Sequence, residues 1–281
     1  MEIQRIYSKN ADFQKLEVLK NNRNKRYKYF EFFVEGVRNI NEAIKNGWVV
    51  HSFIYSFDRE LSRWAADVIK NTRTTLNYEL TNELLSDLSG KTDTSELMAI
   101  LQMREDNTKL FELSENPVLA LFDRPSNKGN LGTVIRSCDA LGVEGLVITG
   151  HAVDLYDPET IAASMGSFFK VPVIRLADNN SVMDWISALK EDFRDLQVIG
   201  TTAHAEKAID ACDLSSPLLF MIGNETDGLS YKFTEISDTM TTIPMDAGSS
   251  ASSFNVACAA SILFYEAARQ RRNRYIPPLA L

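Results

Sequence analysis

Several polar side chains that could do chemistry lie between residues 130 and 255 of the 281-residue chain, beside Gly-, Ser- or Asn-rich loops. They are an amide and a guanidinium at Asn130 and Arg136, a carboxylate at Glu225, and a hydroxyl and an amide at Ser253 and Asn255. Such groups orient polar reactants and stabilise charge that develops during a reaction. A guanidinium is a poor base at neutral pH, so Arg136 is better suited to holding an anion. For either charged residue taken alone, the alternative is an ordinary exposed position on a capped helix or in a turn.

The stretch NKGNLGTVIRSCDALGV (127–143) has to position Arg136. It packs two Asn and two Gly into its first six positions, which gives the backbone freedom to turn tightly. The spacing of the apolar residues that follow predicts a helix with one buried face and Arg136 almost opposite it. Asn130 is expected just before this helix, where its side chain caps it or contacts a bound group. The buried face consists of Val134, Cys138 and Leu141, and Gly142 ends the helix.

From residue 117 onward, short apolar runs rich in β-formers alternate with helical patterns. This alternation predicts a mostly parallel sheet that helices cover on both faces. Ligands bind beyond the carboxyl ends of the strands in such sheets. Four of the runs end in loops rich in Gly, Ser, Thr, Asn or Asp, which predicts a binding site at this edge. The runs are 117–123, 145–150, 171–177, 195–200, 217–223 and 238–245.

The last helix is predicted to begin near Ser252 or Ser253, within SSFNVACAASILFYEAARQRR. Residues 254–268 are apolar nearly all round, so both faces of this helix should be covered. A subunit interface is the simplest source of that cover, with Leu263 and Phe264 as the residues to substitute. The alternative is a helix at the centre of the chain's own core.

The first hundred residues also alternate between helix and strand patterns, and a polar stretch at 104–116 is typical of a linker. We expect an amphipathic helix over 31–47, a strand over 48–57, and helices over 57–72 and 81–90. A domain boundary near 112–116 follows, which gives domains 1–115 and 116–281.

Composition excludes several classes of protein. The chain is 44% hydrophobic, yet no apolar run is long enough to span a membrane, and the N-terminus lacks a signal-peptide pattern. Three cysteines without CxxC spacing favour a reducing, cytoplasmic compartment with buried thiols. Three scattered histidines argue against a metal site.

The formal net charge of −8 argues against nonspecific nucleic-acid binding, but the charge is unevenly spread. Residues 15–28 (KLEVLKNNRNKRYK) hold six basic residues against one acid. A solvated face and a targeted RNA contact are equally open from charge alone. In the second case, the residues that contact phosphates are Lys20, Arg23, Lys25, Arg26 and Lys28.

Three segments carry a family resemblance: NLGTVIRS (130–137), FMIGNETDGLS (220–230), and IPM (243–245) followed by SSFNVACAASILFYEA (252–267). In this order and spacing they resemble the three motifs of the SpoU (TrmH-like) branch of the SPOUT RNA methyltransferases, over about residues 117–272. In the N-terminal part, RYKYFEFFVEGVRNINEAI and TDTSELMAI resemble the family's substrate-binding domain, which is related to ribosomal protein L30e.

The resemblance implies an α/β SPOUT domain with a parallel sheet and a C-terminal trefoil knot, an exception to the rule against knots. A smaller α/β L30e-like domain precedes it and chooses the target, so a fragment from residue 116 onward should still bind cofactor. The implied activity is methylation of a ribose 2′-hydroxyl by a metal-independent homodimer that uses S-adenosylmethionine, with ribosomal RNA favoured over tRNA. The implied catalytic residues are Arg136, Asn130, Glu225, Asn255 and Ser253, and the implied cofactor-binding residues are Thr201, Gly223, Asn224, Ile243, Met245 and Phe254.

Two features depart from the family pattern. The segment from Met245 to Asn255 is about two residues longer than is common, and Phe254 and Ala257 stand where Leu and Ser are usual. Three other functions stay open: a tRNA 2′-O-methyltransferase, an inactive RNA-binding protein, and a SPOUT enzyme that methylates a base nitrogen. The intact polar motif residues argue against the inactive protein, and the SFNVA helix start argues against the base methyltransferase.

Overall fold

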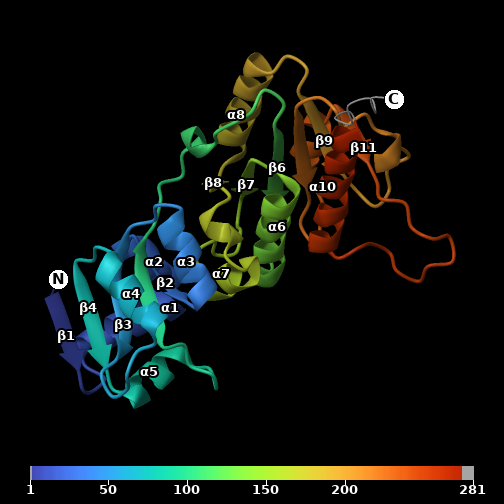
Figure 1. Cartoon of the computed structure of the whole chain (residues 1–281). Helices are drawn as coiled ribbons and strands as arrows, with labels where there is room; N and C mark the ends of the chain where they lie inside the picture. The colour runs from blue at the N-terminus through green and yellow to red at the C-terminus, as the bar shows by residue number, and fades with distance from the viewer. Residues whose placement is uncertain (1, 274–281) are drawn as a thin grey trace, which may run out of the picture. The chain divides into compact units, whose positions relative to one another are not determined.

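A computed structural model describes residues 2–273 and separates the chain into two compact units (Figure 1). The first unit comprises Met1–Arg104 together with Asp154–Lys170, and the second comprises Glu105–Val153 and Val171–Leu281. Residues 154–170 therefore pack in the first unit, although they lie within the second half of the sequence. Each unit is described by itself below.

The first unit contains a mixed five-stranded sheet in the order β1-β4-β3-β5-β2. Strands β1, β4 and β3 are parallel, whereas β5 runs antiparallel to both β3 and β2. The strands are β1 (Glu2–Ile6), β2 (Glu31–Glu35), β3 (Val50–Ser56), β4 (Leu76–Leu80) and β5 (Leu97–Gln102). The helices are α1 (Ala11–Asn21), α2 (Arg23–Tyr29), α3 (Val37–Lys45), α4 (Arg63–Asn71), α5 (Asn82–Ser89) and α7 (Pro158–Ser164), with a 3₁₀ turn, η2, at Ser167–Phe169.

The prediction of a single helix over 31–47 is wrong, because its first part forms β2 and only its second part forms α3. Successive side chains of a strand point to opposite faces, and both faces are covered here. Phe33 packs in a cluster with Phe13 and Leu16 of α1. The Phe32 ring instead lies against Trp48 and against Phe168 and Phe169 of η2. Burial on two faces made the centre of the strand, residues 32–34, continuously apolar, so it lacked the alternation that marks a strand.

Arg26 is buried, with 1% of its surface exposed, so the prediction that it contacts RNA phosphates is wrong in this fold. Its guanidinium donates to Asp154 Oδ2 from Nε at 2.8 Å and from Nη2 at 2.6 Å. Nη1 donates to the carbonyls of Leu19 and Lys20. Arg26 thus joins α1 and α2 to the residue 154–170 segment and is not available to a ligand.

Lys20 is also turned toward the protein, since its Nζ donates to the Leu88 carbonyl at 2.7 Å. Burial lowers the pKa of Lys20. This lysine therefore supports the end of α5 and is a poor candidate for a phosphate contact.

The second unit contains a six-stranded, wholly parallel sheet in the order β11-β9-β10-β6-β7-β8, as the alternating pattern predicted. Each of the six predicted runs coincides with one of its strands, and only β9 extends a residue beyond its run. They are β6 (Val118–Asp123), β7 (Gly145–Thr149), β8 (Val173–Leu176), β9 (Gln197–Thr201), β10 (Leu218–Ile222) and β11 (Thr239–Thr241). The helices are α6 (Lys128–Leu141), α8 (Asn179–Asp192), α9 (Tyr231–Ile236) and α10 (Val256–Asn273), with 3₁₀ turns η1 (Thr108–Leu110) and η3 (Ile209–Ala211).

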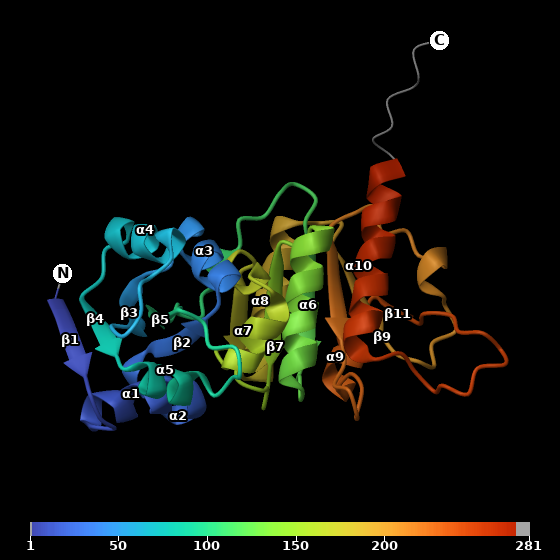
Figure 2. The ribbon, with the colours of Figure 1, turned by 60° about the horizontal axis from the view of Figure 1, so that its bottom comes forward.

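Helices cover both faces of this sheet. Trp185 of α8 and Phe233 of α9 pack with Leu121 and Met221 in the core on one face. On the other face α6 and α10 run side by side (Figure 2). The trefoil knot stays a prediction. Among the helices of residues 2–273, none has the length and apolar character needed to cross a bilayer.

Helix α10 begins at Val256, a few residues later than predicted. Leu263 and Phe264 are each 1% exposed, and the Phe264 ring lies 6.0 Å from that of Phe220 in β10. They belong to the chain's own core, so they are not suitable residues for testing a subunit interface. Tyr265, by contrast, is 51% exposed.

Candidate functional site

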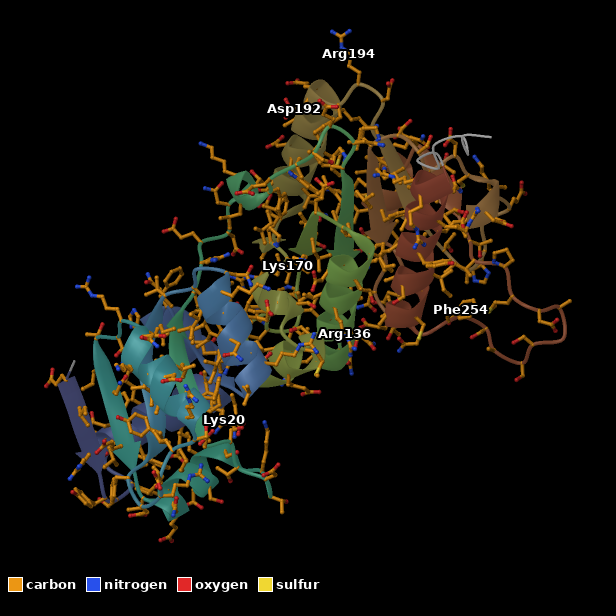
Figure 3. All side chains as sticks on the ribbon, viewed as in Figure 1. Lys20, Arg136, Lys170, Asp192, Arg194 and Phe254 are labelled. Carbon is orange, nitrogen blue, oxygen red and sulfur yellow. The ribbon has the colours of Figure 1, made fainter. Side chains whose placement is uncertain are left out.

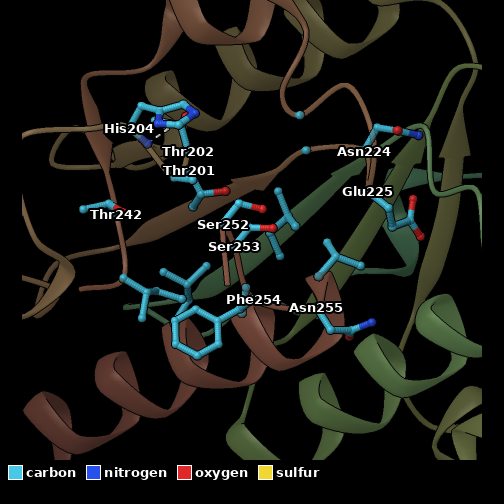
Figure 4. Close-up of a pocket in the computed structure, with 18 of the residues that line it drawn as sticks. Thr201, Thr202, His204, Asn224, Glu225, Thr242, Ser252, Ser253, Phe254 and Asn255 are labelled. Carbon is cyan, nitrogen blue, oxygen red and sulfur yellow. Dashed lines mark hydrogen bonds between the residues drawn. The ribbon is translucent and has the colours of Figure 1, made fainter. Parts of the chain in front are cut away.

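A cavity of about 620 Å³ opens in the second unit, among the loops that follow β9, β10 and β11 (Figure 4). Ten of the eleven predicted catalytic and cofactor-binding residues line it, and Arg136 is the exception. Parallel strands bring their carboxyl ends to one edge, which is why loops far apart in the sequence meet here. The ten are Asn130, Thr201, Gly223, Asn224, Glu225, Ile243, Met245, Ser253, Phe254 and Asn255.

Three polar residues from the three motifs form a hydrogen-bonded row. Asn130 Nδ2 donates to Glu225 Oε1 at 3.3 Å, and Asn255 Nδ2 donates to Asn130 Oδ1 at 3.2 Å. Asn255 Oδ1 in turn accepts from the backbone of Ala257 at 2.9 Å, in the first turn of α10. The side-chain amide of Asn130 is therefore held at both ends, which fixes its orientation at the cavity wall.

Glu225 accepts hydrogen bonds from the chain that leads into α6. Its Oε2 accepts from the backbone and the hydroxyl of Ser126 at 3.0 and 2.6 Å, and its Oε1 accepts from the backbone of Asn127 at 3.3 Å. Burial raises the pKa of Glu225, but the hydrogen bonds from Ser126 and Asn130 outweigh this and hold it below its usual value. The carboxylate is thus ionised at neutral pH and its oxygens are engaged, so it orients other groups and is a poor base.

Asn130 lies in the first turn of α6, not before the helix as predicted. Asn127 is the cap, and its side chain accepts from the backbone of Asn130 at 2.8 Å. Sequence reasoning placed the cap one turn late because Asn127 and Asn130 are both suitable capping residues. The rest of the helix is as predicted, since Val134 and Cys138 are buried and Gly142 ends it in the left-handed conformation.

The turn formed by residues 223–228, here called the Glu225 turn, forms a wall of the cavity. Gly223 can carry no side chain, because a Cβ there would overlap the backbone of Gly228 and Leu229. The Asn224 side chain serves the turn itself: its Oδ1 accepts from the backbone of Thr226 and Asp227 at 2.8 and 3.1 Å.

The remaining lining combines apolar and hydroxyl groups. Ile243, Met245 and Phe254 supply apolar surface, whereas the Thr201 hydroxyl donates to the Met221 carbonyl at 2.9 Å. Thr202 and His204 lie toward one end of the cavity, and Glu225 and Asn255 lie toward the other (Figure 4). Thr202, His204, Thr242 and Ser252 also line the cavity but were not assigned to the site from the sequence, although the polar loops after β9 and before α10 were the available signal.

Arg136 projects from the exposed face of α6 and does not line the cavity (Figure 3). It follows Asn130 by six residues, which places it roughly 9 Å farther along the helix axis. Within residues 2–273, the guanidinium has no ion-pair partner. Arg136 is therefore not positioned to contact a ligand inside the cavity.

The exposed thiol of Cys258 differs from the expectation that all three cysteines are buried, whereas Cys138 and Cys212 are buried as expected. In the part of the chain that the structure describes, no group of three or more His, Cys, Asp or Glu side chains could hold a metal ion.

Known protein families match both parts of the chain. The SpoU rRNA Methylase family matches residues 117–265, and the SpoU L30e-like domain matches residues 10–99. A 23S rRNA (uridine(2479)-2′-O)-methyltransferase of Streptomyces viridochromogenes is 41% identical over 95% of this chain and 92% of its own. A 23S rRNA (guanosine(2553)-2′-O)-methyltransferase, RlmP of Bacillus subtilis, is 26% identical over 90% of this chain and 93% of its own.

The fold is also similar to a solved structure. The SpoU methyltransferase AviRb of Streptomyces viridochromogenes, solved in complex with the cofactor AdoMet, superposes with a TM-score of 0.88 at 40% identity. The match covers 94% of this chain and 98% of that one. From the family match, the relatives and the fold together, we conclude that this chain belongs to the SpoU rRNA methylase family.

Proposed function

We propose that this protein transfers a methyl group from S-adenosylmethionine to a ribose 2′-hydroxyl in structured RNA, with 23S-type ribosomal RNA as the substrate. The observation that carries the proposal is the row from Glu225 through Asn130 to Asn255, which joins the three motifs at the wall of one cavity. The 41% identity to a 23S rRNA 2′-O-methyltransferase supports the choice of substrate.

The cavity suits S-adenosylmethionine in its chemistry. The apolar side chains of Ile243, Met245 and Phe254 would pack against the adenine, and the amide and hydroxyl groups of the lining would bind the polar parts. The bare backbone at Gly223 allows a close approach. When bound, the cofactor supplies the methyl group on a positively charged sulfur.

The protein's own residues would position the RNA and stabilise charge. The fixed Asn130 amide offers a preoriented polar group beside the reacting hydroxyl. Arg136, outside the cavity, would clamp the phosphate of the target nucleotide and stabilise the negative charge that develops on the 2′-oxygen. Ser253, on the segment before α10, would complete the polar wall.

Three basic residues of α2 would form the RNA-binding surface of the first unit: Arg23, Lys25 and Lys28. Arg23 and Lys28 are exposed and Lys25 is half-buried, whereas Arg26 of the same helix is turned inward. The proposed RNA-binding surface thus contains three of the five basic residues that the sequence suggested.

Substitutions in α2 should separate RNA contacts from internal ones. Lys28→Ala should weaken RNA binding and reduce the slope of log affinity against log salt by about one unit. Arg26→Ala is the matched control, because it leaves Asp154 buried without its partner and should cost about 3–5 kcal/mol of stability with an unchanged slope. Filter binding at several salt concentrations and urea unfolding provide the two readouts. A Lys28→Ala slope equal to that of the wild type would exclude this surface.

We also propose a cytoplasmic homodimer. Tyr265 and Cys258 of α10 are exposed, so part of this helix is available to a second copy of the chain. Free thiols are typical of proteins in a reducing compartment. Light scattering of the full chain that gives a monomer at micromolar concentration would contradict the dimer.

The proposed activity is tested by incubating the protein with S-adenosylmethionine and total RNA in EDTA, then mapping 2′-O-methyl sites with and without the protein. We expect one new site in 23S rRNA. A new 2′-O-methyl site in tRNA instead would identify tRNA as the substrate. Cofactor binding without any methylated RNA would identify an inactive RNA-binding protein, and activity lost on chelation would contradict a metal-independent mechanism.

A further inference from the structure

Arg124, the residue directly after β6, holds a backbone conformation that non-glycine residues seldom adopt. Among residues 2–273 three such residues have left-handed φ values: Phe30 at 58°, Arg124 at 51° and Met165 at 52°. Phe30 and Met165 end helices α2 and α7, where a left-handed residue is a common cap. Arg124 follows a strand instead. Backbone strain of this kind persists where the surroundings over-determine it, and it is concentrated at functional sites.

The side chain of Arg124 ties the end of β6 to the Glu225 turn. Its Nε and Nη2 donate to the two oxygens of Asp123 at 3.1 and 3.0 Å, and Nη2 also donates to the Gly228 carbonyl at 3.2 Å. Asp123 is 2% exposed and accepts further bonds from the Thr149 hydroxyl and the Ser230 backbone. One guanidinium thus connects a buried carboxylate to the last residue of the turn.

Space for this side chain depends on Gly150, which directly follows β7. A Cβ on Gly150 would lie 2.7 Å from Arg124 Cγ, closer than carbon atoms approach without displacement. The neighbouring strand therefore leaves room for the arginine in this position.

The backbone of Arg124 holds the same turn a second time. Its carbonyl accepts from Asn224 Nδ2 at 2.6 Å. Asn224 in turn pairs with Gly228 through both backbone groups, at 2.9 and 3.0 Å, and so closes the turn that carries Glu225. Arg124, in its left-handed conformation, thus contacts the turn through both its carbonyl and its guanidinium.

We propose that Arg124 is a positioning residue for cofactor binding: it clamps the Glu225 turn at both ends and thereby sets the wall of the cavity. It does not itself line the cavity, whereas all six residues of the turn do. The proposal rests on the proposed function, because the ligand whose affinity it governs is S-adenosylmethionine.

The test uses the full chain with Arg124→Gly, which accepts the left-handed backbone and keeps the carbonyl that Asn224 contacts, but removes the guanidinium contacts to Asp123 and Gly228. Calorimetry should show a Kd for S-adenosylmethionine raised about tenfold or more, the effect of losing one hydrogen bond to a charged group. The single-turnover rate at saturating cofactor should stay within about threefold of the wild type, because Arg124 does not touch the reactants. Arg124→Lys should give a smaller rise in Kd, because an ammonium can still pair with Asp123. The Kd should not return to the wild-type value, since a point charge cannot serve Asp123 and Gly228 together.

Met165→Gly is the matched control for the backbone, because it replaces another left-handed residue, 42% exposed, in the first unit. It should leave the Kd unchanged. If Arg124→Gly does not fold, the double variant Asp123→Asn with Arg124→Gly removes the unpaired buried charge and gives the same readout.

A wild-type Kd in any folded Arg124 variant overturns the proposal, and so does a rate loss at saturating cofactor with an unchanged Kd. A wild-type protein that does not bind S-adenosylmethionine contradicts the proposed function before any variant is compared.

Discussion

Arg136→Ala is expected to lower the single-turnover rate of RNA methylation by about a hundredfold or more, the scale seen when an enzyme loses one electrostatic stabiliser. The cofactor Kd should not change, because Arg136 does not line the cavity. Thermal stability should not change either, since the side chain is exposed and has no ion-pair partner within residues 2–273. Single-turnover methylation, calorimetry and melting temperature on the same preparations provide the three readouts.

Arg136→Lys separates charge from geometry. It should restore little of the rate, because an ammonium cannot reproduce the planar, two-pronged contact of a guanidinium with phosphate. Arg175→Gln is a control on another arginine of the second unit. Arg175 lies in β8, and its Nη2 is 3.2 Å from Asp106 Oδ2. It should methylate RNA normally. A folded Arg136→Ala protein with nearly full activity would refute the assigned role.

A fragment consisting of residues 116–281 is expected to aggregate and to lose cofactor binding, contrary to the expectation drawn from the sequence. Residues 154–170 belong to the compact first unit, so this fragment carries them without their partners. Tyr156, Phe168 and Phe169 are each less than 5% exposed in the intact chain. Losing that burial costs about 1.5–3 kcal/mol for each large apolar side chain, against a total stability of about 5–15 kcal/mol.

Adding residues 1–104 in trans is the control for this truncation. Residues 1–104 would again supply the partners of residues 154–170. These partners include Arg26, which pairs with Asp154, and Trp48, whose indole donates to the Phe169 carbonyl at 2.9 Å. Solubility and cofactor binding should then be partly restored. Gel filtration and calorimetry measure both. A monodisperse 116–281 fragment with wild-type cofactor affinity would show that the segment does not need the first unit.

The sequence by itself determined the parallel sheet of the second unit and the residues around its cavity. A strand buried on both faces must be apolar throughout, and the loops after such strands must meet at one edge, so local patterns were sufficient. The family resemblance added the roles of Asn130, Glu225 and Asn255. The resemblance did not predict the hydrogen bonds between these residues, because the spacing of motifs in the sequence does not specify the directions of their side chains.

Only the tertiary structure decided which way the charged and apolar side chains face. Arg26 and Lys28 belong to one basic run, yet Arg26 is buried because Asp154, 128 residues later, supplies the carboxylate that makes burial of its charge tolerable. Leu263 and Phe264 looked like interface residues, but both are buried within the chain itself, and the Phe264 ring lies against Phe220 of β10. Arg124 gave no signal at all in the sequence, because its partners Asn224 and Gly228 lie about 100 residues later in the chain. A residue's partners far along the chain are set by the packing of the whole unit, and local composition carries no record of them.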